Sequence, residues 1–495
     1  MSILSYAQAE KEILCRILDK ETGFPVAYAT IQIENKSFGL IANADGDFRI
    51  PLSYKKEEYV LIISSIGYKT LKVELKTLLI NKENIISLIP KIELLDQVVI
   101  NASKTNGDKF MPPREIVKKA IERIPTNYPT NSYSTVGYYR DYQLITNRYY
   151  NLNEAIIESF DAGFQTDIMM DSKNKNVLYS YLENRDFPRD STLLQPYDGN
   201  KKYIDSNTKL SGQGGNELGI LNIHNPIRNY EQLSFSFVYV FKRKFLDNHE
   251  ITNIKKVYLN DEVIYEINFI AKESLTKASH RAKGKIYISK EDFAIHKFNY
   301  AVYEKASLNP LFEVAIEYKK KNDLMYLNYI TFNNQFVVND AFKFDLDGVD
   351  FNLNEKAFYV KFNNEIDTAT LDKKDFKFRF NKKKLLVETI ELIDSVTVKA
   401  KIKAWSLPNV DEKTDMSQFT HRIKNIYDVS KRKLFKAPEI KGFQYREYFV
   451  QEVFVDKKIP YDIPTINNYS PLSEAEKVNN KDESTYWLNT PLKSK

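Results

Sequence analysis

The first hundred residues alternate short apolar runs with polar turns, a pattern typical of a small β-sandwich. Alternation is clearest in Thr30-Ile31-Gln32-Ile33-Glu34, where Ile31 and Ile33 share one strand face. Asp45-Gly46 supplies the positive-φ residue that a tight hairpin requires. We therefore predict seven strands, at residues 13–18, 29–34, 39–43, 48–50, 59–65, 70–75 and 85–89.

A helix is predicted after the polar stretch 103–111, which we interpret as a linker. Pro112 and Pro113 suit the first helical turn, and Pro125 is expected to end the helix. Between them, apolar residues recur at helical spacing: Ile116, Val117, Ala120, Ile121 and Ile124. The apolar face of this helix is expected to cover a sheet.

Three hairpins then repeat one plan: a strand, a charged turn, and a strand rich in Tyr, Phe and Ile. They occupy residues 256–269, 284–302 and 313–332. Such hairpins predict a large, twisted antiparallel sheet with one face on a core. Residues 160–235 are less regular and include the Gly-rich stretch 211–216. That stretch lacks the spacing and the Lys of a phosphate-binding loop, so we interpret it as a surface loop.

The last ninety residues break the hairpin pattern. Phe419, Ile423 and Ile426 lie on one helical stripe, which predicts a helix over 416–434 with Asp415 as its N-cap. Residues 443–455 predict a strand, and Ser473-Glu-Ala-Glu476 has the form of a capping box that begins a short helix.

The expected fold is mainly β: an N-terminal seven-stranded β-sandwich, then a large antiparallel sheet that can form a half-barrel, with a few helices. The predicted domains are a sandwich at 10–102, a linker at 103–111 and a helix with the large sheet at 112–404. Residues 405–495 are expected to supply a helix and an irregular segment that packs on the sheet domain.

The N-terminal domain carries a resemblance to a known family in motifs that follow one another in order. They are Glu21-Thr22-Gly23, Pro25, Ala29-Thr30-Ile31, Gly39, Asn43, Asp45-Gly46, Phe48, Ser64, Gly67-Tyr68 and 94–102. This order resembles the carboxypeptidase regulatory-like family, a transthyretin-like sandwich of peptidases, outer-membrane receptors and other surface proteins. The resemblance implies a domain without catalytic activity. Cys15-Arg16 departs from the family, which has a glycine nearby.

The hairpins of residues 256–332 are loosely similar in architecture to lipoprotein-carrier-like half-barrels, although no motif is shared. This second resemblance implies a curved sheet that can hold hydrophobic cargo.

Composition supports folded domains: 43% of the 495 residues are hydrophobic and 13% are aromatic. A chain of this length divides into about two to four domains. Its 72 basic and 66 acidic residues give a net charge of +6, a mixed surface that does not favour a nucleic-acid partner.

The N-terminus indicates export. Ala7-Gln8-Ala9 before Glu10 has the small-x-small pattern of a signal-peptidase site, although the apolar stretch before it is short. We expect a truncated signal peptide and a periplasmic or outer-membrane-associated protein; a chance match in a cytoplasmic protein is the alternative. Cys15 lies in an apolar run after Glu10-Lys-Glu12, so we expect a core residue and not a lipidation site.

Candidate catalytic chemistry is sparse. The five histidines do not form a His-Glu-x-x-His or His-x-x-Glu motif; they are His224, His249, His280, His296 and His421. Asp345, Asp347 and Asp350 could bind calcium or act in glycoside hydrolysis, but a solvated turn is favoured. The sequence therefore assigns no catalytic, metal-binding or ligand-binding residue and no cofactor.

The leading interpretation is a non-enzymatic binding or scaffold protein of the cell envelope. It would dock through its N-terminal sandwich, by strand addition to an envelope or outer-membrane protein, and bind a ligand or partner with its sheet domain. One alternative is a carrier of lipid or other hydrophobic cargo, in an apolar pocket lined by Phe, Tyr and Ile of residues 256–332. Another is a carbohydrate-active enzyme with two convergent carboxylates.

Overall fold

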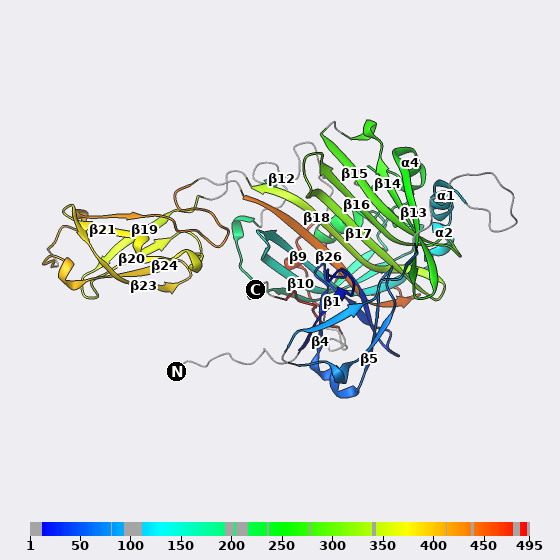
Figure 1. The fold of residues 1–495 in the computed structure, drawn as a ribbon, viewed down its shortest axis with the longest axis horizontal. Helices are drawn as coiled ribbons and strands as arrows, with labels where there is room; N and C mark the ends of the chain where they lie inside the picture. The colour runs from blue at the N-terminus through cyan, green and yellow to red at the C-terminus, as the bar shows by residue number, and fades with distance from the viewer. Residues whose placement is uncertain are drawn as a thin grey trace.

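The computed structural model describes residues 12–80, 82–93, 111–193, 202–203, 216–234, 237–276, 279–338, 343–411, 413–436, 440–478 and 486–492. The predicted mainly β fold is confirmed. An N-terminal sandwich lies against a large antiparallel sheet, and a third β unit projects to one side (Figure 1). Residues 1–10, the predicted linker apart from Met111, and the Gly-rich stretch apart from Asn216 lie outside the described residues.

All seven strands predicted in the sandwich are confirmed. They are β1 (Glu12–Asp19), β2 (Thr30–Ile33), β3 (Gly39–Ile41), β4 (Asp47–Pro51), β5 (Val60–Ser64), β6 (Leu71–Glu74) and β7 (Asn84–Leu88). They form two sheets, β4-β1-β7 and β3-β2-β5-β6. Period-two alternation places Ile13, Cys15 and Ile17 of β1 in the core between the sheets. At the predicted Asp45-Gly46 turn, Gly46 has φ +74°, and the Asn43 side chain accepts from the Asp45 and Asp47 N–H groups.

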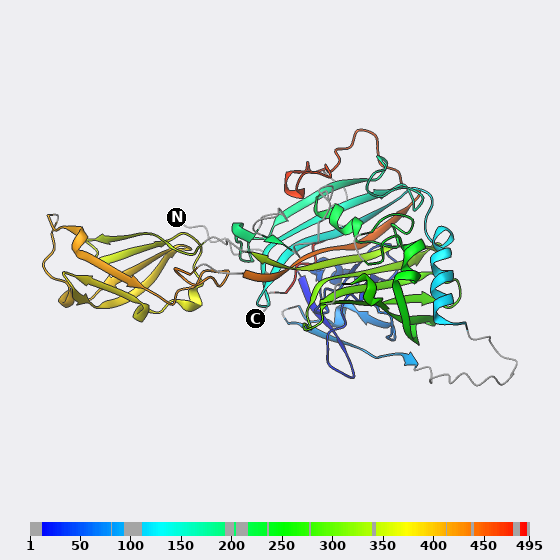
Figure 2. The same cartoon turned by 90° about the horizontal axis from the view of Figure 1, so that it is seen from above.

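The large sheet has twelve strands among the described residues, in the order β11-β10-β9-β26-β18-β17-β16-β15-β14-β13-β8, with β12 paired to β18. The three predicted hairpins are confirmed as β13–β14, β15–β16 and β17–β18. Figure 2 shows these long strands running side by side. Their bounds are β8 (Ile92–Glu93), β9 (Tyr133–Ile145), β10 (Arg148–Asp161), β11 (Lys175–Glu183), β12 (Lys202–Tyr203), β13 (His249–Leu259), β14 (Glu262–Ala271), β15 (His280–Ser289), β16 (Ile295–Glu304), β17 (Pro310–Lys321), β18 (Leu324–Val338) and β26 (Ile440–Val455).

Among the described residues, four α-helices accompany this sheet: α1 (Pro113–Glu122), α2 (Ile124–Asn127), α3 (Glu217–Ile223) and α4 (Phe241–Asn248). The predicted amphipathic helix is confirmed as α1, whose Ile116, Val117, Ala120 and Ile121 are buried on the sheet. Pro125 does not simply end it, because Pro125 lies in the first turn of α2, where a missing N–H costs no hydrogen bond. Figure 1 shows α1, α2 and α4 at the end of the sheet away from the third unit. No helix in the described ranges has the length and apolar character of a membrane span.

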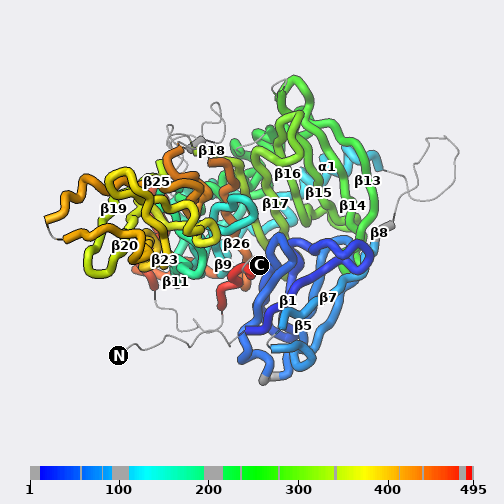
Figure 3. The backbone as a smooth tube through the Cα atoms, turned by 60° about the vertical axis from the view of Figure 1, so that its left-hand side comes forward, coloured from blue at the N-terminus to red at the C-terminus, as the bar shows by residue number. Residues whose placement is uncertain are grey.

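The sandwich packs on the other face of the sheet (Figure 3). Tyr28 stacks on Tyr329 of β18, with 5.0 Å between ring centroids, and Ile41 joins the same apolar cluster. A second junction lies at the sheet edge, where β8 pairs with β13 and the Gly67 N–H donates to the Tyr258 carbonyl at 2.8 Å. Two separate contacts therefore fix the sandwich to the sheet.

The third unit, residues 343–436, is here named the lobe. Its strands are β19 (Leu346–Asn352), β20 (Ala357–Phe362), β21 (Phe376–Phe380), β22 (Lys383–Leu385), β23 (Val387–Asp394), β24 (Thr397–Ile402) and β25 (Phe419–Ile423). They form the sheets β19-β20-β24-β23 and β22-β21-β25 around a separate apolar core. We propose the lobe as a domain of its own, inserted between β18 and β26, so that the boundary predicted at residue 405 falls inside it.

Two helix predictions near the C-terminus are wrong. Residues 416–434 contain a 3₁₀ turn, η8 (Met416–Gln418), and strand β25 in place of a helix. Phe419 and Ile423 are four residues apart, a spacing that fits both the helical and the strand period. The segment forms a strand because it pairs with β21. Asp415 does cap the 3₁₀ turn by accepting from the Ser417 N–H at 2.9 Å. The predicted capping-box helix is a single 3₁₀ turn, η9 (Leu472–Glu474). The strand predicted at 443–455 is confirmed as β26.

Candidate functional site

The histidines do not gather. His224 stacks on Phe332 with 3.7 Å between ring centroids, and His249 packs against Phe269 at 5.1 Å. Burial lowers the pKa of His224 to about 3 and that of His249 to about 4. The third buried histidine, His296, lies 3.6 Å from Glu262. No group of three or more His, Cys, Asp or Glu in the described part of the chain could hold a metal ion.

The other residues that the sequence singled out are structural. Cys15 lies in the sandwich core, where burial raises the pKa of its thiol to about 12. Asp347 and Asp350 are exposed on β19, so the predicted turn is wrong; Asp345 precedes this strand and pairs with Lys343 at 2.7 Å. Asn216 caps α3 by accepting from the Leu218 and Gly219 N–H groups.

The apolar pocket expected within residues 256–332 is occupied by the protein's own side chains. On the helix-covered face, the ring centroid of Phe245 of α4 lies 4.9 Å from that of Phe269 of β14. The ring centroids of Phe241 and Phe298 of β16 are 5.7 Å apart. Side chains of α1 and α3 join the same continuous core. Over β14 and β16, this face is therefore filled by the aromatic side chains of α4.

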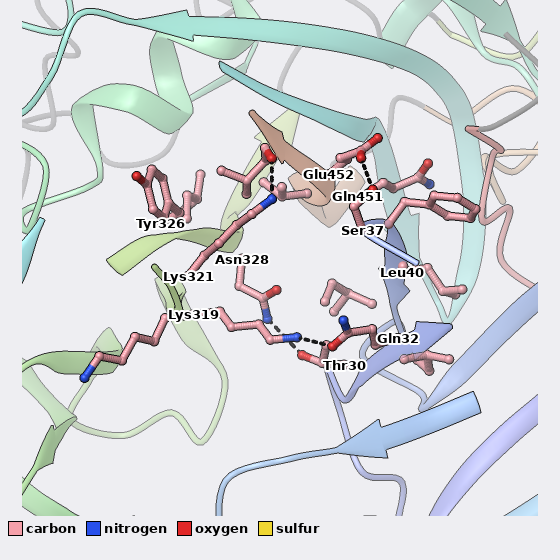
Figure 4. A pocket seen from close by; sticks show the side chains of 18 residues that line it. Thr30, Gln32, Ser37, Leu40, Lys319, Lys321, Tyr326, Asn328, Gln451 and Glu452 are labelled. Carbon is pink, nitrogen blue, oxygen red and sulfur yellow. Dashed lines mark hydrogen bonds between the residues drawn. The ribbon is translucent and has the colours of Figure 1, made fainter. Parts of the chain in front are cut away.

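Space remains on the opposite face, between the sandwich and the sheet. A crevice of about 300 Å³ lies between β2–β3 of the sandwich and the strand ends of β17, β18 and β26 (Figure 4). Its lining mixes aliphatic and polar side chains with three consecutive lysines, Lys319, Lys320 and Lys321. Its volume fits ordered water or a small polar molecule.

The polar groups of the crevice already bind one another across it. Lys319 donates to the Gln32 amide oxygen at 2.9 Å, and Asn328 donates to the Thr30 hydroxyl at 2.9 Å. Ser37 donates to Glu452 of β26. Partial burial lowers the pKa of Lys319, and the like charge of Lys321 adds to this effect. These contacts make the crevice a seam that holds the sandwich in place (Figure 4).

Residues 486–492, here named the strap, cross the same seam. Trp487 completes the sandwich core, with its ring 6.2 Å from that of Phe38 and 5.3 Å from that of Tyr54. Its indole N–H donates to the Arg49 carbonyl at 3.0 Å. On the sheet side, the Gln451 amide donates to the Trp487 carbonyl at 2.7 Å and accepts from the Trp487 N–H at 3.3 Å. The strap thus joins β4 to β26.

The strap continues along β4. Asn489 donates to the Ile41 carbonyl at 3.0 Å and accepts from the Arg49 N–H at 2.9 Å. The Arg49 guanidinium donates to the carbonyls of Thr490 and Pro491 at 2.6 and 3.0 Å. These bonds occupy backbone groups on the edge of β4, so the strap covers this sandwich edge.

Buried ion pairs in the described part of the chain support the assembly at two junctions. Arg140 of β9 pairs with Glu447 of β26 at 2.5 Å beneath the sandwich, and both side chains are inaccessible. At the base of the lobe, Arg432 pairs with Asp428 at 2.6 Å and also with Asp190 of the sheet domain. Neither site was predicted from the sequence, because Glu447 and Asp190 lie 307 and 242 residues from their arginines and no motif marks the nearby Asp428.

Two solved structures share weak likeness with this chain. A LolA superfamily protein from Nitrosomonas europaea has 11% identity and a TM-score of 0.19, over 46% of this chain and 86% of its own. A DUF1329 family protein from Desulfovibrio piger has 6% identity and a TM-score of 0.21, over 45% and 86%. The predicted loose resemblance to lipoprotein carriers thus agrees with the kind of structure found. TM-scores this low carry no argument about function.

No curated protein matches the sequence. Residues 15–100, which form the sandwich and the segment after it, match the family described as the CarboxypepD_reg-like domain. This match confirms the resemblance found in the motifs, and the N-terminal sandwich is the part of the chain that is similar to a known family.

Proposed function

We propose that the protein is a non-enzymatic binding or scaffold protein of the bacterial cell envelope. The observation that carries the proposal is the use of both sheet faces for the protein's own packing: helices pack on one, and the sandwich with the strap covers part of the other. The outer surfaces of the sandwich and the lobe then remain for partners. The rigid attachment of the sandwich suits a scaffold that presents surfaces in a fixed arrangement.

The carrier alternative requires space on a sheet face, and the filled aromatic core counts against it. The carbohydrate-active alternative requires two carboxylates that converge in a cleft. Among the acids proposed for that role, Asp347 and Asp350 point to solvent from β19.

Cell fractionation and cross-linking test the proposal. In the native host, the tagged full chain should appear in the envelope fraction and migrate in a discrete protein complex after in-cell cross-linking. Native mass spectrometry of the purified chain should give the polypeptide mass without a lipid adduct. A cytoplasmic monomer would contradict the proposal, and a stoichiometric lipid would restore the carrier alternative.

A further inference from the structure

The sandwich has a strip of exposed aliphatic side chains on β7 and on the residues that flank it. Leu79, Ile80, Ile85 and Ile89 are between 39% and 56% exposed. Ile85 and Ile89 point outward, because the alternate residues Ile86 and Leu88 are buried in the core. Single exposed apolar residues are common on proteins, but four within one short segment form a patch.

The same strand is an open sheet edge. In the order β4-β1-β7, β7 has a strand neighbour on one side only, and Arg16 of β1 lies opposite Ile85. Another segment reaches the outer edge at Ile89, whose carbonyl accepts from the Lys69 N–H at 2.8 Å. Along residues 85–88, no other described segment hydrogen-bonds to that edge.

Three other edges in the described chain are covered at least in part. The strap occupies β4, and β8 pairs with part of β13. At β11, the Ile466 and Val478 N–H groups donate to the Asn176 and Leu178 carbonyls. Proteins usually protect edges in this way, so an apolar edge left open indicates a place for another strand.

Lysines frame the strip at both ends. Lys82 precedes β7, while Lys20 and Lys69 lie at its far end, where their N–H groups donate to the Leu88 and Ile89 carbonyls. All three are exposed, and none pairs with a carboxylate of another described residue. The neighbouring Glu83 is paired with Arg16 at 3.1 Å. The three lysines therefore place positive charge at both ends of the strip, beside Asp19 and Glu21 at the Leu88 end.

We propose that this strip binds an extended segment of an envelope protein partner, with aliphatic residues at alternate positions and acidic residues at both flanks. The inference rests on the proposed scaffold function. The segment adds to the edge of β7 by backbone hydrogen bonds, its aliphatic side chains pack on Ile85 and Ile89, and its acids meet the lysines.

A second copy of this chain fits the strip poorly. Antiparallel pairing of two β7 edges would bring Lys82 of each copy toward Lys20 and Lys69 of the other, which places like charges together. Four half-exposed aliphatic side chains also offer only a few hundred Å², below the roughly 1,000 Å² of a stable interface. Strand addition by a partner segment needs less area, because backbone hydrogen bonds contribute.

Photo-cross-linking in the native host tests the inference. p-Benzoylphenylalanine replaces exposed Ser87, which lies between Ile85 and Ile89 on the outer face; the control position is Leu308, 90% exposed in the β16–β17 turn. Position 87 should give one discrete protein adduct and position 308 should not. The cross-linked partner segment, identified by mass spectrometry, should alternate aliphatic residues between acidic flanks.

Affinity measurements with a synthetic peptide of that segment complete the test. Ile85→Glu should raise the peptide Kd at least tenfold, and Lys82→Glu should raise it several-fold with a weaker dependence on salt. Leu308→Glu should leave the Kd unchanged. Thermal unfolding must show that each variant remains folded, as expected for substitutions of exposed side chains.

Three results would overturn the strip as the binding site: an adduct between two copies of this chain, a partner segment without acidic flanks, or equal adducts at positions 87 and 308. Absence of an adduct at position 87, while the envelope complex persists, would reject the strip and leave the scaffold proposal standing. Absence of the complex itself would reject the scaffold proposal.

Discussion

At the scale of single residues, charge is buried where separate segments of the chain meet. Arg432 is inaccessible between Asp428 of the lobe and Asp190 of the sheet domain, and it also donates to the Thr192 hydroxyl at 2.8 Å. Such a cluster adds little net stability over apolar packing, but removal of one partner leaves an uncompensated charge. It therefore determines where the lobe attaches more than how stable the fold is.

Substitution of this arginine tests that interpretation. Arg432→Met should lower the free energy of unfolding by about 3–5 kcal/mol, because two buried carboxylates lose their counter-charge. Urea unfolding measures the loss. Lys374→Met, which removes an exposed pair with Asp372, is the control and should cause no measurable change. An equally small effect of both substitutions would contradict a buried charge cluster.

The buried side chain of His249 predicts that the free energy of unfolding depends on pH. Burial lowers the pKa of His249 from 6.5 to about 4, so the unfolded chain takes up a proton first on acidification. This histidine therefore favours the folded state above pH 6.5, and that contribution is lost as the pH falls toward 4. Between pH 7 and 5 the loss should be about 2 kcal/mol.

His249→Asn isolates this effect, because the Asn amide can still donate to the Phe245 carbonyl, as the ring Nδ1 does at 2.9 Å. The variant loses ring packing at every pH. Its deficit in unfolding free energy relative to the wild type should nevertheless shrink on acidification from pH 7 to 5. A deficit that stays constant with pH would show that His249 is not buried in its neutral form.

At the scale of elements, the sequence predicted strands well where one face meets a core and the other meets solvent. The sandwich strands and the three hairpins have this alternation. β9 and β10 escaped prediction because both of their faces are buried, so polar residues such as Glu154 and Glu158 lie inside and alternation disappears. In the C-terminal part, the four-residue spacing of Phe419 and Ile423 suited two periods, and only pairing with β21 distinguished them.

The docking edge of the sandwich also could not be predicted from the sequence alone. The sequence predicted docking at a sandwich edge but did not indicate which edge, because the segment that covers β4 is distant in the chain. The strap that covers β4 lies more than 400 residues beyond it. The filled aromatic face was likewise hidden, because α4 is short and its phenylalanines gave no separate signal.

The insertion of the lobe can be tested directly. Val338 and Ile440 are paired across β18 and β26, so the two chain ends left by excision are already neighbours. Replacement of residues 339–439 by Asn-Gly, with Asp190→Asn to remove the orphaned charge, should leave the sheet folded with a cooperative thermal transition. Residues 343–436 alone should give a dispersed amide spectrum, because they enclose their own core.

Deletion of residues 216–248 provides the contrast. This segment supplies α3 and α4 to the core of the large sheet, so its loss should abolish cooperative unfolding. Failure of the lobe excision to fold, with similar damage from both deletions, would show that the lobe is part of the sheet domain.

At the scale of the whole molecule, the two tryptophans form a natural pair of probe and control. Trp487 is 9% exposed in the sandwich core, whereas Trp405 is 76% exposed on the lobe. Trp487→Ala should lower the free energy of unfolding of the sandwich by about 3–5 kcal/mol. Trp405→Ala should have little effect.

Hydrogen exchange followed by mass spectrometry localises the change. In Trp487→Ala, exchange should rise first in β3 and β4, which the strap contacts, and only later in the large sheet. Uniformly faster exchange over the whole chain would contradict a local role for the strap.

The position of Trp487 also has a consequence for biogenesis. The sandwich is synthesised long before residue 487, yet its hydrophobic core is completed only when that indole packs against Phe38 and Tyr54. A nascent or prematurely terminated polypeptide therefore displays an incomplete N-terminal fold to chaperones and proteases. Packing of Trp487 against Phe38 and Tyr54 therefore follows the synthesis of residue 487, and translation that stops earlier leaves these contacts unmade.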